Sequence, residues 1–192
     1  KKRIFALPIG IDPVFLSHRE EPRTRDILFV GGWTRLKGRV HLVEIIKKLS
    51  VYNITASIIG TGIYEKRVLA DFPEAIRGRI RVVKYLPRDL LKREYISHKI
   101  FLFPSLFEGY GNVVLEAMAS GMVVVISKDL GVSEIIEDGY NGFLIEKRDV
   151  EGFAKKVKDI LNNETIRNKI GENAQKTIRH MTWDAAAEIF IK

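Results

Sequence analysis

Apolar residues fall into short runs, separated by stretches in which they recur every three or four positions. The runs are apolar nearly throughout and rich in β-branched residues, as expected for strands buried on both faces. They predict strands at residues 27–30, 55–59, 80–83, 100–103, 123–126 and 142–145. Helical periodicity predicts helices between them at 40–49, 63–69, 89–97, 112–120 and 133–137. This alternation is typical of an α/β fold with a parallel sheet covered by helices.

The C-terminal part of the chain loses the alternation. Residues 150–161, 165–179 and 183–191 predict consecutive helices without a strand between them. We therefore expect a doubly wound, Rossmann-like parallel sheet of about six strands that ends in a helical tail. No internal repeat or low-complexity linker divides the chain, so residues 1–192 are expected to form a single domain.

The composition supports a globular domain. Of 192 residues, 46% are hydrophobic and 29% are charged, proportions that differ from those of disordered chains. No apolar run approaches the roughly 20 residues of a membrane-spanning helix, and we expect a cytoplasmic protein. The absence of cysteine excludes disulfides and thiolate metal sites. Few cysteines and many ion-pairing residues are also common in proteins of thermophiles.

The charge balance bears on possible partners. The chain carries 32 Lys and Arg against 24 Asp and Glu, a formal net charge of +8. Such an excess favours polyanions, anionic lipid surfaces or phosphorylated small molecules, unless it only solvates the surface. No dense basic run with interleaved aromatics is present, so we expect no nucleic acid. The four histidines are scattered, without zinc spacing, and we expect no metal.

The loops after the predicted strands are the candidate binding region, because ligands of such sheets bind outside the carboxyl ends of the strands. Glycine-rich loops let backbone N–H groups approach an anion closely, and three follow strands, with Gly31-Gly32, Gly60-Thr61-Gly62 and residues 104–111. Gly60-Thr61-Gly62 lacks the third glycine and the downstream acid of a dinucleotide-binding motif. A tight turn near a nucleotide is therefore expected there, and a nicotinamide cofactor is not.

Residues 101–121 carry the most informative pattern. A strand ends at Pro104, a loop carries Glu108 and two glycines, and a helix begins near Asn112, a plausible N-cap. The N–H groups of residues 109–113 would face an anion at the helix start. Glu108 and Glu116 could accept hydrogen bonds from vicinal sugar hydroxyls. Alternatively, Glu108 caps a loop and Glu116 is an ordinary surface residue of the helix.

This segment resembles the signature of the family-4 (group 1) retaining glycosyltransferases, in which two glutamates are separated by seven residues. The chain matches the pattern Pro-Ser-x-x-Glu-Gly-x-Gly, followed by Glu-Ala-x-Ala-x-Gly. Further similarity covers residues 8–12, 59–62 and 131–144, and Trp183. The resemblance implies a GT-B enzyme of two domains, of which this chain is the C-terminal donor-binding half. The N-terminal acceptor domain is then absent, and the chain alone should be inactive.

The resemblance also implies an activity. A sugar would pass from a UDP-, GDP- or ADP-sugar to an unknown acceptor with retention of configuration, without a metal or other cofactor. Glu116 would bond the ribose hydroxyls, and Glu108 would lie beside the donor sugar and contribute to the chemistry. The remaining donor contacts would be Gly31, Gly32, Gly60, Leu86, Gly109, Tyr110, Gly111, Asn112 and Val113. Peripheral association of the full protein with the cytoplasmic face of a membrane is a further expectation.

One motif departs from the family pattern. The family has Gly-Arg-Leu and then Lys-Gly after the first strand, and its Arg and Lys grip the diphosphate. Here Lys37-Gly38 fits, but Gly32 stands where the Arg is expected. We expect Arg35 to supply the cation, because a guanidinium bonds phosphate bidentately. Lys37 and Arg35 would then offset charge on the leaving diphosphate.

Other functions stay open at this point. Arg35 could be a solvated loop charge, and the substitution at Gly32 could mean an altered donor contact. The chain could then be a non-catalytic or regulatory nucleotide-sugar-binding module. A sugar-nucleotide epimerase or a phosphorylase-like enzyme can share the architecture, although the Glu108–Glu116 pattern argues against the epimerase.

Overall fold

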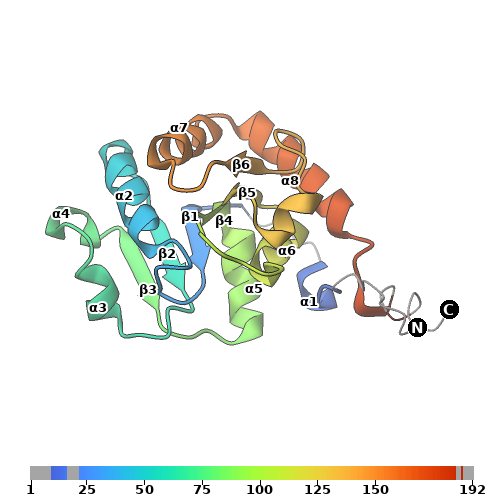
Figure 1. The fold of residues 1–192 in the computed structure, drawn as a ribbon, viewed down its shortest axis with the longest axis horizontal. Helices are drawn as coiled ribbons and strands as arrows, with labels where there is room; N and C mark the ends of the chain where they lie inside the picture. Colours follow the sequence, from blue (N-terminus) through green and yellow to red (C-terminus); the bar gives the residue numbers. More distant parts are fainter. Residues whose placement is uncertain (1–9, 17–21, 185–186, 188–192) are drawn as a thin grey trace, which may run out of the picture.

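The structure is a computed structural model that describes residues 10–16, 22–184 and 187. Its centre is a six-stranded sheet in the order β3-β2-β1-β4-β5-β6, with every pair of neighbours parallel (Figure 1). The strands are β1 (Arg25–Val30), β2 (Ala56–Ile59), β3 (Ile80–Val83), β4 (His98–Phe103), β5 (Val123–Ser127) and β6 (Phe143–Ile145). All six predicted strands are confirmed, with ends that differ by one or two residues at most.

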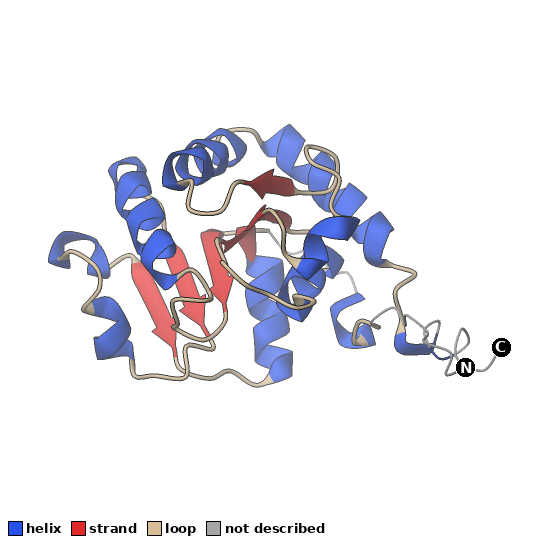
Figure 2. Cartoon of the chain, viewed as in Figure 1, coloured by secondary structure: helices blue, strands red, loops and turns tan. Residues whose placement is uncertain are grey.

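The helices cover both faces of the sheet (Figure 2). They are α1 (Pro13–Leu16), α2 (Arg39–Leu49), α3 (Glu65–Leu69), α4 (Glu74–Arg77), α5 (Arg88–Ser97), α6 (Asn112–Ala119), α7 (Val150–Leu161) and α8 (Glu164–Ile178). The short 3-10 helices are η1 (Ser50–Tyr52) and η2 (Gly131–Ile135). The helix predicted at 133–137 is the 3-10 turn η2, displaced toward the N-terminus. The third predicted tail helix lies largely outside the described residues.

The core lies between the sheet and its two helical layers. The central strands β4 and β5 are buried on both faces, which explains the apolar runs at residues 100–103 and 123–126. On one face α2 packs against α7, and on the other α6 packs against α8. The tail helices begin with side-chain caps, since Asp149 accepts from Gly152 N–H and Asn163 accepts from Ile166 N–H.

The strand order determines where in the sheet the candidate site lies. The chain moves outward from β1 through β2 to β3, then returns to β4 on the other side of β1. The connections that leave β1 and β4 therefore lead to strands in opposite directions along the sheet, and such a switch point is where doubly wound sheets bind ligands.

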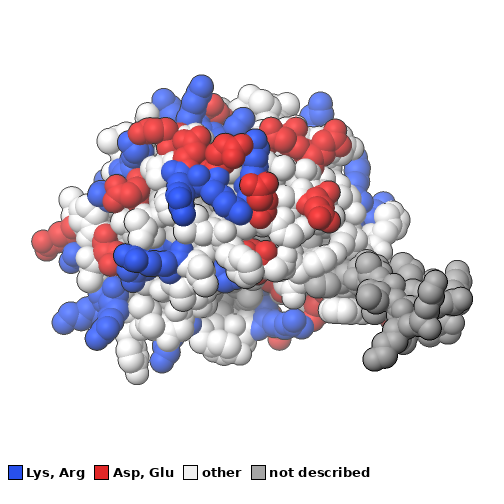
Figure 3. All heavy atoms as spheres, in the orientation of Figure 1, with Lys and Arg blue, Asp and Glu red and all other residues white. Residues whose placement is uncertain are grey.

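The described surface carries charges of both signs. On the face seen in Figure 3, acidic and basic side chains intermingle, without a continuous basic stripe. Within the described ranges, no helix has the length and apolar character needed to cross a membrane.

Candidate functional site

The loops after β1 and β4 are joined at the switch point. The Leu36 carbonyl accepts hydrogen bonds from Leu106 N–H at 2.8 Å and from Ser105 Oγ at 2.9 Å. Gly38 has φ +77°, and a Cβ added to it would lie 1.9 Å from the Pro104 carbonyl oxygen. Only glycine fits at such a left-handed position of close approach. The glycine of the Lys-Gly motif therefore lets the two loops touch.

The same contact brings two predicted site residues together. Lys37 Nζ and Glu108 Oε2 form an ion pair across the loops. Both side chains are sheltered, with 31% of Lys37 and 16% of Glu108 exposed. The ammonium also lies 5.8 Å from the centre of the Phe103 ring, within cation–π range. A cation and a carboxylate are thus held side by side at the carboxyl edge of the sheet.

The start of α6 presents a group of backbone donors. Among the described residues, the N–H groups of residues 109–113 have no hydrogen-bond acceptor. They lie where the helix dipole is positive. The prediction that Asn112 caps this helix is wrong. Gly111 holds the cap position at φ 74°, without a side-chain cap, and Asn112 is the first helical residue and exposed.

The physical reason for this difference is local packing. A Cβ on Gly111 would lie 2.9 Å from Val132 Cγ1, so the chain enters the helix through a tight left-handed turn against η2. A turn of this kind leaves the amides free in place of a side-chain cap. The anion site predicted for this segment stays a prediction, and its donors would be backbone amides.

The loops after β2 and β3 extend this edge. Gly31 N–H donates to the Ile59 carbonyl and Gly60 N–H donates to the Val83 carbonyl, each at 2.9 Å. These bonds continue the pattern of the sheet past the strand ends. Gly31 and Gly60 have φ of 154° and 76°, which only glycine adopts readily. Gly32 N–H has no acceptor among the residues that the structure describes.

Two predicted donor contacts lie at the margin of this region. Arg35 is exposed in the loop after β1, and its guanidinium has no partner among the described residues. Leu86 follows β3, half-buried and packed against the core. The structure does not bring Arg35 to the Lys37–Glu108 pair.

Glu116 has a defined environment in α6. Its Oε2 accepts a hydrogen bond from the Tyr95 hydroxyl at 2.9 Å, and Tyr95 is completely buried. Burial raises the pKa of Glu116, opposed by the Tyr95 hydrogen bond and the nearby Arg88 guanidinium. Arg88 in turn forms an ion pair with Asp12. Glu116 is therefore half-buried and bonded, and is not an ordinary surface residue.

Both ends of the described chain meet beside Glu116. Ile11 N–H donates to the Met181 carbonyl at 2.7 Å. A Cβ on Gly10 would lie 2.3 Å from the Trp183 backbone nitrogen. A small cavity of about 40 Å³ results, lined by Gly10, Ile11, Asp12, Arg88, Asn112, Leu115, Glu116 and Trp183. The first residues of the predicted motif at 8–12 lie outside the described residues.

Sequence reasoning missed Tyr95 and Arg88. A buried tyrosine hydroxyl needs an acceptor, so a tyrosine on the apolar face of α5 was an available signal. The hydrogen-bond acceptor, Glu116, lies on α6, so this pair could be found only from the packing of α5 against α6. Among the histidines, His98 is buried and bonded to Ser57 Oγ at 2.9 Å. In the described part of the chain, no group of three or more His, Cys, Asp or Glu could hold a metal ion.

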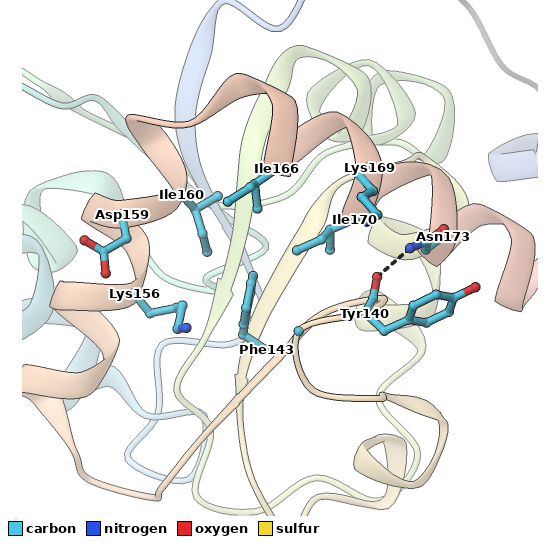
Figure 4. A pocket seen from close by; sticks show the side chains of 10 residues that line it. Tyr140, Phe143, Lys156, Asp159, Ile160, Ile166, Lys169, Ile170 and Asn173 are labelled. Atoms are coloured by element: carbon cyan, nitrogen blue, oxygen red, sulfur yellow. Dashed lines mark hydrogen bonds between the residues drawn. The ribbon is translucent and has the colours of Figure 1, made fainter.

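A larger cavity lies away from these residues. It occupies about 370 Å³ between β6, α7 and α8 (Figure 4). Its lining is mostly apolar, and Lys156 Nζ stands 4.3 Å from the centre of the Phe143 ring. None of the residues predicted from the sequence lines it. It also lacks the combination of free amides and carboxylates found at the start of α6.

Comparison with known proteins places the chain in a family. The family model of the group 1 glycosyl transferases matches residues 14–177. The capsular polysaccharide biosynthesis glycosyltransferase CapM of Staphylococcus aureus is 34% identical over 79% of this chain and 40% of its own length. An uncharacterized glycosyltransferase of Methanocaldococcus jannaschii is 32% identical over 84% of this chain and 42% of its own length. The chain spans less than half the length of these curated relatives.

Solved structures share the fold. The C-terminal domain of a group 1 glycosyl transferase (LpcC) from Francisella tularensis has a TM-score of 0.75 at 24% identity, with 88% of this chain and 97% of that chain covered. A mutant of S. aureus TarM, in complex with Fondaparinux, alpha-GlcNAc-glycerol and UDP, has a TM-score of 0.82 at 20% identity. That match covers 100% of this chain and 39% of TarM.

Proposed function

Because this chain belongs to the group 1 glycosyl transferases, we propose that it is the C-terminal, donor-binding domain of a two-domain GT-B enzyme. Its length supports this, since it spans less than half of its curated relatives but aligns with 97% of a solved C-terminal domain. The acceptor then binds mainly to an N-terminal domain. The chain alone binds the donor without transferring its sugar.

The observation that carries the proposal is the Lys37–Glu108 pair beside the free amides of residues 109–113. A nucleoside diphosphate at the start of α6 receives hydrogen bonds from these amides and meets the Lys37 ammonium. Glu108 then lies next to the diphosphate, where an attached sugar offers its hydroxyls. Glu116 accepts from the ribose hydroxyls, and Gly31, Gly32, Gly60 and Leu86 line the remainder of the nucleotide.

The proposed chemistry is transfer of the sugar with retention of its configuration. The bond between the anomeric carbon and the diphosphate oxygen breaks, and a bond between that carbon and an acceptor oxygen forms. Negative charge develops on the diphosphate oxygen, which takes up the proton that the acceptor loses. Lys37 and the helix amides stabilise this charge without rearranging, as preorganised donors do. Arg35, which is exposed and unpaired in the described structure, supplies the second cation in place of the family's arginine. Together they provide the positive charge, so the proposal invokes no metal ion.

The donor is proposed to be a UDP-, GDP- or ADP-sugar, and one structural neighbour was solved with UDP. We further propose that the full protein works in the cytoplasm, on the inner face of a membrane. The net charge of +8 supports this, because basic surfaces favour anionic lipids. Relatives named for capsular polysaccharide and lipopolysaccharide core biosynthesis are also consistent with it.

The direct test is calorimetric titration of the chain with UDP, GDP, ADP and inorganic phosphate. At least one nucleoside diphosphate should bind, and Glu116→Ala should weaken that binding more than it weakens phosphate binding. Glu164→Ala, at an exposed glutamate of α8, is the matched control and should leave both unchanged. Failure of all three nucleotides to bind would overturn the donor-domain proposal. Equal weakening of nucleotide and phosphate by Glu116→Ala would remove the ribose role.

A further inference from the structure

A buried tyrosine of α5 holds one oxygen of the Glu116 carboxylate. The Tyr95 hydroxyl donates to Oε2 at 2.9 Å, while Oε1 has no hydrogen-bond partner among the described residues. Burial and the adjacent carboxylate raise the pKa of Tyr95 well above its usual value. The hydroxyl therefore keeps its proton at all physiological pH values and acts toward the carboxylate as a donor.

The position of Tyr95 is itself fixed from several directions. Its ring packs edge-on against Phe15, with 5.6 Å between centroids, and in a tilted arrangement against Phe101, with 5.9 Å between centroids. Its carbonyl accepts from Arg23 Nη1 at 2.8 Å, and Arg23 Nη2 donates to the Ser120 carbonyl at 2.6 Å. Arg23 thus bonds α5, which carries the tyrosine, to the end of α6, which carries the glutamate. The hydroxyl and the carboxylate are held in register by buried contacts.

We propose that Tyr95 is a positioning residue, whose hydroxyl anchors one oxygen of Glu116 and so directs the other toward the ribose of the donor. This inference rests on the ribose role proposed above for Glu116. A carboxylate anchored at one oxygen has lost its rotational freedom before the ligand arrives. Binding then costs less conformational entropy of the Glu116 side chain, so the hydrogen bond to the ribose contributes more to the affinity.

The neighbours of Glu116 explain why an anchor matters. Arg88, at the start of α5, and Asp12 both lie near enough to influence the pKa of Glu116, and Arg88 pairs with Asp12. Without the Tyr95 hydroxyl, Arg88 becomes the strongest remaining partner and draws the carboxylate away from its ribose-binding orientation. The anchor keeps Glu116 independent of this exposed ion pair.

The test compares ribose recognition in Tyr95→Phe and in the unaltered chain. Calorimetry gives the affinities for UDP, GDP and ADP and for their 2′-deoxy counterparts. The readout is the ratio of the ribonucleotide affinity to the 2′-deoxynucleotide affinity for the same base. Because each ratio is taken within one variant, a general loss of stability cancels. Phenylalanine keeps the ring packing, and Tyr140→Phe, at a tyrosine whose hydroxyl has no partner in the described structure, is the matched control.

We expect the unaltered chain to prefer the ribonucleotide, and Tyr95→Phe to reduce that preference by about two- to tenfold, as loss of one hydrogen bond predicts. In a Glu116→Gln background, Tyr95→Phe should change the ratio no further. The acid limb of nucleotide binding should also move to higher pH in Tyr95→Phe, since the carboxylate loses a donor that stabilises its charge.

Three results would overturn the inference, and they differ in whether the ribose role of Glu116 falls with it. If the unaltered chain prefers the ribonucleotide and Tyr95→Phe keeps the full preference, the positioning role fails and the ribose role of Glu116 stands. If the unaltered chain binds ribo- and 2′-deoxynucleotides equally, both roles fail together. Equal weakening of nucleotides and inorganic pyrophosphate by Tyr95→Phe would mark the tyrosine as structural only.

Discussion

Replacing Gly38 by alanine should damage both the fold and the proposed site. The residue has φ +77°, and the new Cβ would lie 1.9 Å from the Pro104 carbonyl oxygen, far inside van der Waals contact. The loops after β1 and β4 must therefore separate. Their separation breaks the hydrogen bonds that Ser105 and Leu106 donate to the Leu36 carbonyl, and it pulls apart the ion pair beside them.

The magnitude follows from these losses. A left-handed backbone costs a non-glycine residue about 1–2 kcal/mol, and each lost hydrogen bond costs about 1 kcal/mol. Gly38→Ala should therefore lower the free energy of unfolding by about 3–4 kcal/mol. In a domain of this size the melting temperature should fall by about 10 °C.

Urea unfolding and nucleotide calorimetry measure the two consequences of Gly38→Ala. The matched control is Gly78→Ala, because Gly78 has φ −63° and no heavy atom within 4 Å of an added Cβ. That variant should be as stable as the unaltered chain or slightly more so. If Gly38→Ala unfolds and binds nucleotide like the unaltered chain, the reasoning from loop contact is refuted.

Three further predictions follow from single side chains. Lys37→Ala should weaken nucleoside diphosphate binding at least tenfold by calorimetry, as loss of a charge-assisted hydrogen bond predicts, while Lys48→Ala, at another lysine of similar exposure, should not. Arg35→Ala should weaken the same binding by roughly three- to tenfold and reduce its salt dependence; no change in either would mark a solvated loop charge. Burial lowers the pKa of His98 to about 4, and unfolding restores about 6.5. The free energy of unfolding, measured with urea, should therefore fall by about 3 kcal/mol as the pH falls from about 6.5 to about 4. An equally steep fall in the His98→Gln variant would contradict this.

The strands were predictable because their burial leaves a direct mark on the sequence. A strand segment covered on both faces must be apolar at nearly every position, and residues 100–103 of β4 and 123–126 of β5 meet that requirement. The short elements α1, α4 and η1 were not predicted, since helices of three or four residues are too short to establish a period.

The candidate site was predictable in its parts but not in its contacts. The spacing of Glu108 and Glu116 and the Lys37-Gly38 dipeptide indicated the chemistry. That Lys37 pairs with Glu108, and Tyr95 with Glu116, depends on strand order and helix packing across long stretches of chain. The N-cap at Asn112 was wrong because side-chain preference does not reveal a left-handed glycine immediately before it.

The central claim is that a nucleoside diphosphate binds where the loop after β1 meets the start of α6. Amide chemical-shift mapping of the isotope-labelled chain with UDP, GDP and ADP tests it most directly. We expect the largest shifts at the amides of residues 109–113, with others at Gly31, Gly32 and Gly60. Shifts concentrated instead around the cavity between β6, α7 and α8 would contradict the account.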